Sequence, residues 1–314
     1  YDPLQTDTEW MLAPAQRVHL IREGRLVRPY VFGMTWEMDP KTYGISYELD
    51  TSQVHSIYLF THGDPYTLLG LFPGDLHLFG VHDGTVFLLG TDTMGRDLLS
   101  RILHGGRLSL SVGLIGIAIS FLLGITIGGF SGYLGGVFDT ASQRVIEFIR
   151  SIPTLPLWMA LSVALPKDWS ITQTYFAIVV ILSLVGWTGL ARVVRGKFLA
   201  LRSEDFVMAA HICGSSQARI IFRHMLPSFT SHIIASLTMN IPGMILGETS
   251  LSFIGLGLQA PAISWGVLLK DAQHIRVLAK APWLLAPGAF IVVAILAFNF
   301  LGDGLRDAAD PYGR

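Results

Sequence analysis

Apolar residues are distributed unevenly along this chain. Five long apolar stretches, in which polar residues are rare, lie in the second two thirds of the sequence. A helix of about 20 apolar residues can cross the hydrocarbon core of a bilayer, and it satisfies its own backbone polar groups there. The pattern therefore predicts five membrane-spanning helices, at about 108–132, 145–165, 172–190, 229–257 and 283–301.

The first third of the chain has a different pattern. Short runs that mix aromatic and β-branched residues occur at 26–32, 43–49, 53–60 and 85–89, separated by turn-forming Pro, Gly and Asp residues. Such alternation is typical of short strands and hairpins. We therefore predict a small β-rich module at 1–90, followed at 91–314 by a mainly α, polytopic helical membrane domain.

Composition supports a membrane protein. The 314 residues are 51% hydrophobic and only 14% charged, whereas soluble domains carry about 25% charged residues. Disordered chains are poor in apolar residues, so disorder is excluded. A net charge of −1 without a long basic run argues against a nucleic-acid partner. The single cysteine, Cys213, excludes a disulfide scaffold or a cysteine-built metal site.

The charges between the stretches predict an orientation. The link between the third and fourth stretches contains many more basic than acidic residues, which indicates a cytoplasmic loop at 191–228. Counting spans from that loop places the C-terminus in the cytoplasm and residues 1–107 outside. Because Tyr1 is preceded by neither a signal peptide nor a span, we expect a first transmembrane helix to be missing ahead of it.

Four glycines follow one another at four-residue intervals in and just after the first stretch: Gly124, Gly128, Gly132 and Gly136. On one helix they would share a face and let a second helix approach closely. A glycine-lined path for a substrate is the alternative interpretation.

The cytoplasmic link contains two short amphipathic segments between residues 203 and 227. Glu204 and Asp205 suit a helix N-terminus, where carboxylates meet the positive end of the helix dipole. Gly214 breaks the segment, and Ser215 or Ser216 can cap a second helix that runs to Pro227. A helix pair that lies on the membrane surface without a partner remains the simplest alternative.

The order Ala209-Ala210, Gly214, Pro227 resembles the EAA loop of binding-protein-dependent ABC importer permeases. Met208 and His224 depart from that family, which often has Glu and Ile at these positions. The resemblance implies that the loop docks on an ATPase subunit. The residues it implicates in coupling are Glu204, Asp205, Ala209, Ala210, Gly214, Ser215, Arg219 and Pro227.

Further segments resemble the C-type subunit of the oligopeptide/dipeptide/nickel permease family. They comprise 88–97 (LLGTDTMGRD), 132–136 (GYLGG), 248–257 (ETSLSFIGLG), 264–266 (SWG) and 299–307 (NFLGDGLRD). The 1–87 module looks like an enlarged extracytoplasmic loop found in some members, in which 71–73 (LFP) and 77–80 (HLFG) have counterparts. This loop either helps to receive the substrate-binding protein or covers and stabilises the outer face.

The resemblance implies a type I ABC importer permease in a bacterial or archaeal-type inner membrane. Its partners would be a second permease subunit, two ATP-binding subunits and an extracytoplasmic substrate-binding protein. The sequence has no GxxxxGK[ST] motif, so we expect a non-catalytic subunit without a cofactor, with ATP and Mg²⁺ bound by the partners. Oligopeptides or dipeptides are the expected cargo. Nickel chelates, opines or oligosaccharides, or ATP-independent transport, are the alternatives.

Three residues of the fourth stretch are candidates for the translocation pathway. Glu248 is an ionisable residue inside an apolar stretch, which is a functional candidate by default. A structural hydrogen bond is its competing role. Met239 and Asn240 lie nearer mid-span and either line the pathway or pack against the partner permease. An intramembrane protease is disfavoured, because HExxH is absent and Glu248 is the only carboxylate well inside a span.

Overall fold

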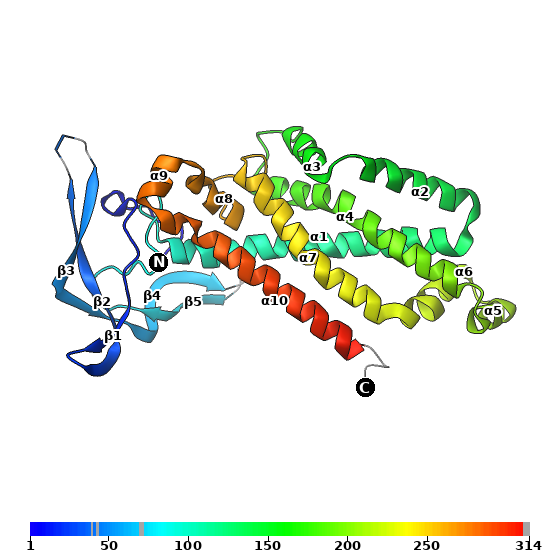
Figure 1. Ribbon diagram of the computed structural model, residues 1–314, viewed down its shortest axis with the longest axis horizontal. Coiled ribbons are helices and arrows are strands. Elements are labelled where there is room, and N and C mark those ends of the chain that lie inside the picture. Colours follow the sequence, from blue (N-terminus) through cyan, green and yellow to red (C-terminus); the bar gives the residue numbers. More distant parts are fainter. Residues whose placement is uncertain (39, 42–43, 69–71, 310–314) are drawn as a thin grey trace. The chain divides into compact units, whose positions relative to one another are not determined.

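The computed structural model describes residues 1–38, 40–41, 44–68 and 72–309 (Figure 1). It divides into two compact units. The first contains Tyr1–Gly106 and Leu268–Gly288, and the second contains Arg107–Val267 and Ala289–Arg314. Each unit is described by itself below.

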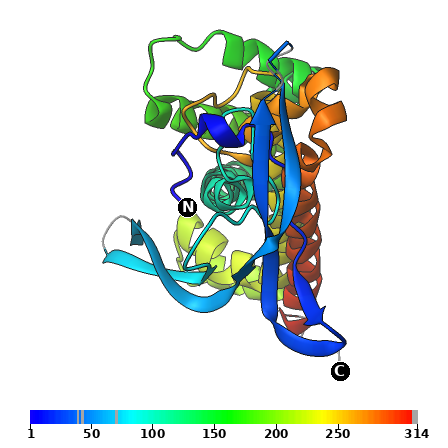
Figure 2. The ribbon, with the colours of Figure 1, turned by 90° about the vertical axis from the view of Figure 1, so that its left-hand side faces the viewer.

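The first unit contains the β-rich module. Its strands form a three-stranded antiparallel sheet of order β1-β2-β3 and a separate antiparallel pair, β4-β5. Figure 2 shows β2 and β3 as one long, narrow ribbon and β4 and β5 as a second. The strands are β1 (His19–Arg22), β2 (Arg25–Met38), β3 (Ile45–Ser56), β4 (Tyr58–Leu68) and β5 (Phe72–Gly80).

The β-rich character of the N-terminal part is thus confirmed, with one local correction. The predicted strand at 85–89 does not form, because its amides bond to side chains instead of a neighbouring strand. The Phe87 amide donates to Oε1 of Gln16 at 2.7 Å, and the Val86 amide donates to the Tyr1 hydroxyl at 2.8 Å. Tyr43, at the start of another predicted strand, and Leu71, in the LFP motif, lie outside the described residues.

The rest of the chain is helical, and α1, α8 and α10 each continue from one unit into the other. The helices are α1 (Leu98–Leu134), α2 (Gly136–Ser151), α3 (Thr154–Val163), α4 (Ile171–Leu201), α5 (Asp205–Ile212), α6 (Gln217–Arg219), α7 (Thr230–Phe253), α8 (Trp265–Lys270), α9 (Ile275–Lys280) and α10 (Ala286–Ala309). Between α6 and α7 the chain forms a π-helical turn at Ile220–Met225 and a 3₁₀ turn at Leu226–Phe229.

Among the described residues, three helices are long and apolar enough to cross a membrane: Leu98–Leu134, Ile171–Leu201 and Pro282–Ala308. They contain the predicted stretches 108–132, 172–190 and 283–301. A fourth candidate is the pair Gln217–Phe229 and Ile233–Phe253, bent by 79°. The predicted stretch 229–257 corresponds mainly to the second helix of this pair. That helix ends at Phe253, four residues before the predicted end.

The predicted span at 145–165 is not one helix. It is divided between α2 and α3, because Pro153 has no amide hydrogen and disfavours a helical residue before it. Ile152 is accordingly extended, with φ −91° and ψ 130°. α3 is a short apolar helix of 10 residues.

Three of the four aligned glycines place α1 directly against α4. A Cβ on Gly128 would lie 2.5 Å from the Ala191 carbonyl oxygen, and one on Gly132 would lie 2.6 Å from the Arg195 carbonyl oxygen. A Cβ on Gly124 would lie 2.9 Å from Leu190. The backbones of α1 and α4 therefore approach so closely that no side chain fits between them at these positions. This close approach favours helix packing over a glycine-lined path.

Gly136 does not share that face, which corrects the prediction. α1 ends at Leu134, and the chain turns through Gly135 and Gly136 with φ of +67° and +59°. This left-handed conformation is accessible to glycine at little cost. Gly136 thus serves the turn into α2, and a Cβ there would meet nothing within 4 Å.

Glu248 forms a fully buried hydrogen-bond hub in the second unit. Its carboxylate accepts hydrogen bonds from the hydroxyls of Ser264 (2.7 Å), Ser252 (2.8 Å) and Ser109 (3.3 Å). Ser109 in turn accepts the Trp265 amide at 3.0 Å. One carboxylate thereby connects α1, α7 and the segment that leads into α8.

We expect Gly128→Ala to destabilise the chain by about 2 kcal/mol, because the clash with α4 outweighs the roughly 1 kcal/mol by which Ala favours a helix. Thermal unfolding of the purified protein measures the change. Gly196→Ala on α4 is the matched control, since its Cβ would meet nothing within 4 Å. Equal unfolding temperatures for the two variants would contradict close backbone contact at Gly128.

We expect Glu248→Leu to lower the free energy of unfolding by about 3 kcal/mol, because three buried hydroxyls lose their acceptor. Glu248→Gln keeps the side-chain shape and one acceptor oxygen, so its loss should be less than half as large. Chemical denaturation of both variants in detergent checks the order. A Leu variant as stable as the wild type would show that the hub contributes nothing to the fold.

Candidate functional site

The segment between α4 and α7 begins with α5, whose ends follow from the local sequence. Asp205 lies in the first turn, where its carboxylate meets the helix dipole, and Glu204 occupies the N-cap position. Gly214 ends the helix with a left-handed φ of +76°. The Ser215 amide donates to the Ala210 carbonyl at 3.1 Å, so the last turn of α5 is closed by backbone hydrogen bonds.

The second helical part is less regular than predicted. Of the two serines considered as its cap, Ser216 takes the role, because its hydroxyl accepts the Arg219 amide at 3.4 Å. α6 itself has only 3 residues, and the helical path continues through the π-helical turn to the 3₁₀ turn that contains Pro227.

The inner face of α5 packs onto the rest of the second unit. Val207 and Ala210, three residues apart on the helix, are 2% and 9% exposed. They belong to one hydrophobic cluster with the π-helical turn, the end of α4 and the start of α7. Its other buried members are Ile125, Leu190, Val194, Phe198, Ile220, Ile221, Met225, Phe229 and Ile233. α5 is therefore attached to the π-helical turn and shares one buried cluster with α4 and the start of α7.

The outer face of α5, defined here as Phe206, Met208, Ala209 and Ile212, is apolar and exposed. Phe206 is 42%, Met208 52% and Ile212 81% accessible to solvent, and Ala209 is also exposed. Exposed apolar patches of this kind mark interaction sites when polar residues surround them. Exposed Glu204, Asp205 and Arg219 flank the patch along the chain.

The residues implicated in coupling differ in their exposure to solvent. Glu204, Asp205, Ala209, Gly214, Arg219 and Pro227 are exposed, and Ser215 is half-buried. Ala210 points into the cluster and serves the attachment of α5. The small side chain at position 210 has a packing role that the motif alone does not distinguish from a docking role.

The three pathway candidates on α7 do not converge on one site. Met239 and Asn240 are exposed, and the Asn240 amide side chain donates to the Ser236 carbonyl one turn earlier. Glu248 is instead enclosed in its serine hub, without exposure to solvent. The hub matches the structural role considered for Glu248, whereas Met239 and Asn240 present a free surface.

An ion pair between α2 and α4 was not anticipated from the sequence. Arg195 donates to Asp139 through Nε (2.5 Å) and Nη2 (2.6 Å), and Asp139 also accepts the Ser131 hydroxyl. The Arg195 hydrogen bond lowers the pKa of Asp139 from its usual value. The partners lie 56 residues apart, so no local spacing reveals them.

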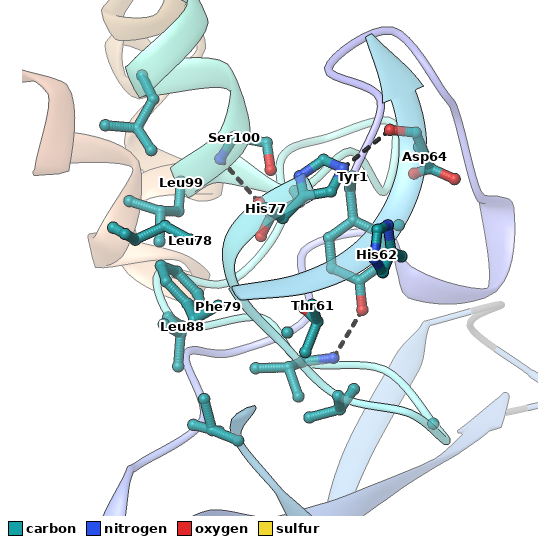
Figure 3. A pocket seen from close by; sticks show the side chains of 18 of the residues that line it. Tyr1, Thr61, His62, Asp64, His77, Leu78, Phe79, Leu88, Leu99 and Ser100 are labelled. Carbon is teal, nitrogen blue, oxygen red and sulfur yellow. Dashed lines mark hydrogen bonds between the residues drawn. The ribbon is translucent and has the colours of Figure 1, made fainter. Parts of the chain in front are cut away.

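The first unit has a pocket of about 410 Å³ beside the β4-β5 pair (Figure 3). Leu78, Phe79 and Leu88 give it an apolar lining, and Nε2 of His77 lies 2.8 Å from the Asp64 carbonyl oxygen. Among the described residues, no group of three or more His, Cys, Asp or Glu side chains is placed to hold a metal ion.

Comparison with known proteins identifies the family. Residues 124–312 match the binding-protein-dependent transport system inner membrane component family. The chain is 43% identical over 227 residues to the oligopeptide transport system permease protein OppC of Haemophilus influenzae, covering 72% of this chain and 70% of the relative. It is 40% identical over 223 residues to the dipeptide transport system permease protein DppC of Bacillus subtilis, covering 71% and 68%.

A solved structure shares the fold. An inward-facing MetNI methionine ABC transporter chain aligns with a TM-score of 0.53 at 16% identity, covering 68% of this chain and 98% of that chain. The region that matches the family, residues 124–312, includes the α4-to-α7 segment. The chain therefore belongs to the binding-protein-dependent transport system inner membrane components, and among them it is similar to the oligopeptide and dipeptide permeases of the C type.

Proposed function

We propose that this chain is the C-type permease subunit of an ATP-driven importer of oligopeptides or dipeptides, and that α5 couples it to an ATPase subunit. The observation that carries this proposal is the similarity to oligopeptide and dipeptide permeases over more than two thirds of the chain. The apolar outer face of α5 supplies the docking surface that such a subunit needs.

The two faces of α5 suit a coupling helix. Phe206, Met208 and Ile212 insert into a groove of the ATPase, where their burial favours association. Val207 and Ala210 keep α5 attached to α4 and α7. When ATP binding draws two ATPases together, α5 moves with them and the helices re-pack toward the outward-open state. Hydrolysis then restores the inward-open state, so ATP biases a two-state equilibrium at a distance.

In this importer the present chain performs no chemistry. ATP and Mg²⁺ bind to the partner ATPases, and no cofactor belongs to this subunit. A second, homologous permease completes the pathway, and the exposed Met239 and Asn240 of α7 contact either that partner or the passing peptide. Nickel chelates, opines and oligosaccharides remain alternative cargoes, and an ATP-independent carrier is the less favoured function.

The proposed orientation places the α4-to-α7 segment and the C-terminus in the cytoplasm of a bacterial or archaeal-type cell. The basic residues of that segment support this orientation through the excess of Lys and Arg in cytoplasmic loops. The β-rich module, with residues 1–107, then lies outside. There it receives the substrate-binding protein or covers the outer end of the helices.

We expect Ile212→Glu to reduce ATPase co-purification by at least about tenfold, because a charge replaces the most exposed apolar anchor of the docking face. Folding of the chain should be unaffected, since Ile212 is 81% exposed. The readouts are ATPase recovered with the tagged permease pair and ATP-driven peptide uptake into proteoliposomes.

Ile275→Glu on α9 is the matched control, because Ile275 is 83% exposed and lies in the other unit. Normal ATPase recovery with Ile212→Glu would exclude α5 as the docking element. If the unmodified assembly never takes up peptides in response to ATP, the importer function itself is wrong.

A further inference from the structure

A polar pocket of about 500 Å³ lies between α2 and α4 in the second unit, away from the outer face of α5. α2 contributes Asp139, Arg144 and Glu147 to its lining, and α4 contributes Arg192 and Arg195. With Thr140 and Gln143, which also line the pocket, these α2 residues follow one another at helical spacings of three or four positions and so share one side of the helix. The pocket therefore combines three guanidinium groups with two carboxylates.

The charges in this pocket are not evenly paired. Arg195 and Asp139 form an ion pair with two hydrogen bonds, and Asp139 also accepts a hydrogen bond from the Ser131 hydroxyl. Arg144 contacts Glu147 at 2.6 Å, but both side chains are largely exposed, at 77% and 47%. Exposed ion pairs of this type are weak. The Arg192 side chain has no hydrogen bond or ion pair in the part of the chain that the structure describes.

An exposed apolar side chain lies beside one of the two available arginines. Phe148 follows Arg144 by one helical turn, on the same side of α2, and is 70% exposed. A cationic group and an uncovered apolar group thus lie side by side, which is the pattern of a surface that meets a headgroup and an acyl chain together.

The position along α4 is that of a membrane boundary. The apolar stretch 172–190 is long enough to cross about 30 Å of hydrocarbon, and Arg192 lies two residues beyond its end. An arginine deep in hydrocarbon is costly, whereas one at the boundary reaches the phosphates of the headgroups.

We infer that Arg192 and Arg144 form a binding site for the phosphate of an anionic phospholipid, whose acyl chain lies along Phe148. The planar guanidinium groups suit a phosphate with two acceptor oxygens. Asp139 neutralises Arg195 and holds α2 against α4, so it shapes the pocket without competing for the lipid. The site goes beyond peptide import, because it requires only that α4 crosses a membrane.

Native mass spectrometry of the purified, assembled transporter tests this site with phosphatidylglycerol and phosphatidylcholine of identical acyl chains. We expect preferential retention of phosphatidylglycerol, and a loss of about fivefold in Arg192→Gln as one headgroup contact disappears. Glu147→Gln should act in the opposite direction and increase retention, because it releases Arg144. Arg276→Gln on α9 is the control of equal charge, with unchanged retention expected.

Three results would overturn the inference: unchanged retention in Arg192→Gln, equal retention of both lipids by the wild type, or no gain in Glu147→Gln. An excess of inorganic phosphate distinguishes the source of the anion. Full displacement of the lipid by phosphate would assign the pocket to a free anion instead. If Arg192→Gln does not fold, Arg192→Lys replaces it, with partial loss of retention expected.

Discussion

The close contact between the backbones of α1 and α4 is the constraint on which the second unit depends. Between helices surrounded by lipid the hydrophobic effect offers little, so association relies on close packing and hydrogen bonds. Gly128 and Gly132 permit that packing, because a single methyl group at either position would overlap a carbonyl of α4. α4 in turn carries hydrophobic clusters near both of its ends, one with α5 and the π-helical turn and one with α3 and α7.

Two sets of polar contacts also hold the helices of the second unit together. At the Glu248 hub, one carboxylate collects three serine hydroxyls and so joins segments that are far apart in the sequence. At the other place, Asp139 and Arg195 join α2 to α4 just after the glycine turn. A buried carboxylate is costly unless its oxygens are satisfied. Glu248 is fully buried and has three hydroxyl donors, and the partly buried Asp139 has Arg195 and Ser131 as donors.

Sequence patterns predicted the features that depend on local chemistry. The long apolar stretches identified α1, α4 and α10, and Gly214 correctly marked the end of α5. The sequence patterns failed where a nonlocal or competing contact decides the local structure. Pro153 divides an apolar stretch that hydropathy alone reads as continuous, and the amides near Phe87 find side-chain partners in place of a strand. The partners of Glu248 and Asp139 were not foreseeable, since they lie up to 139 residues away.

The division of α5 into two faces has a consequence for how such a subunit diverges. Val207 and Ala210 are held by residues of the same polypeptide, so a change there must be matched within this gene. In the importer that we propose, Phe206, Met208 and Ile212 are matched by a groove encoded in another gene. The two faces of one short helix would then evolve under separate constraints, and ATPases could be exchanged between related permeases by altering the outer face alone.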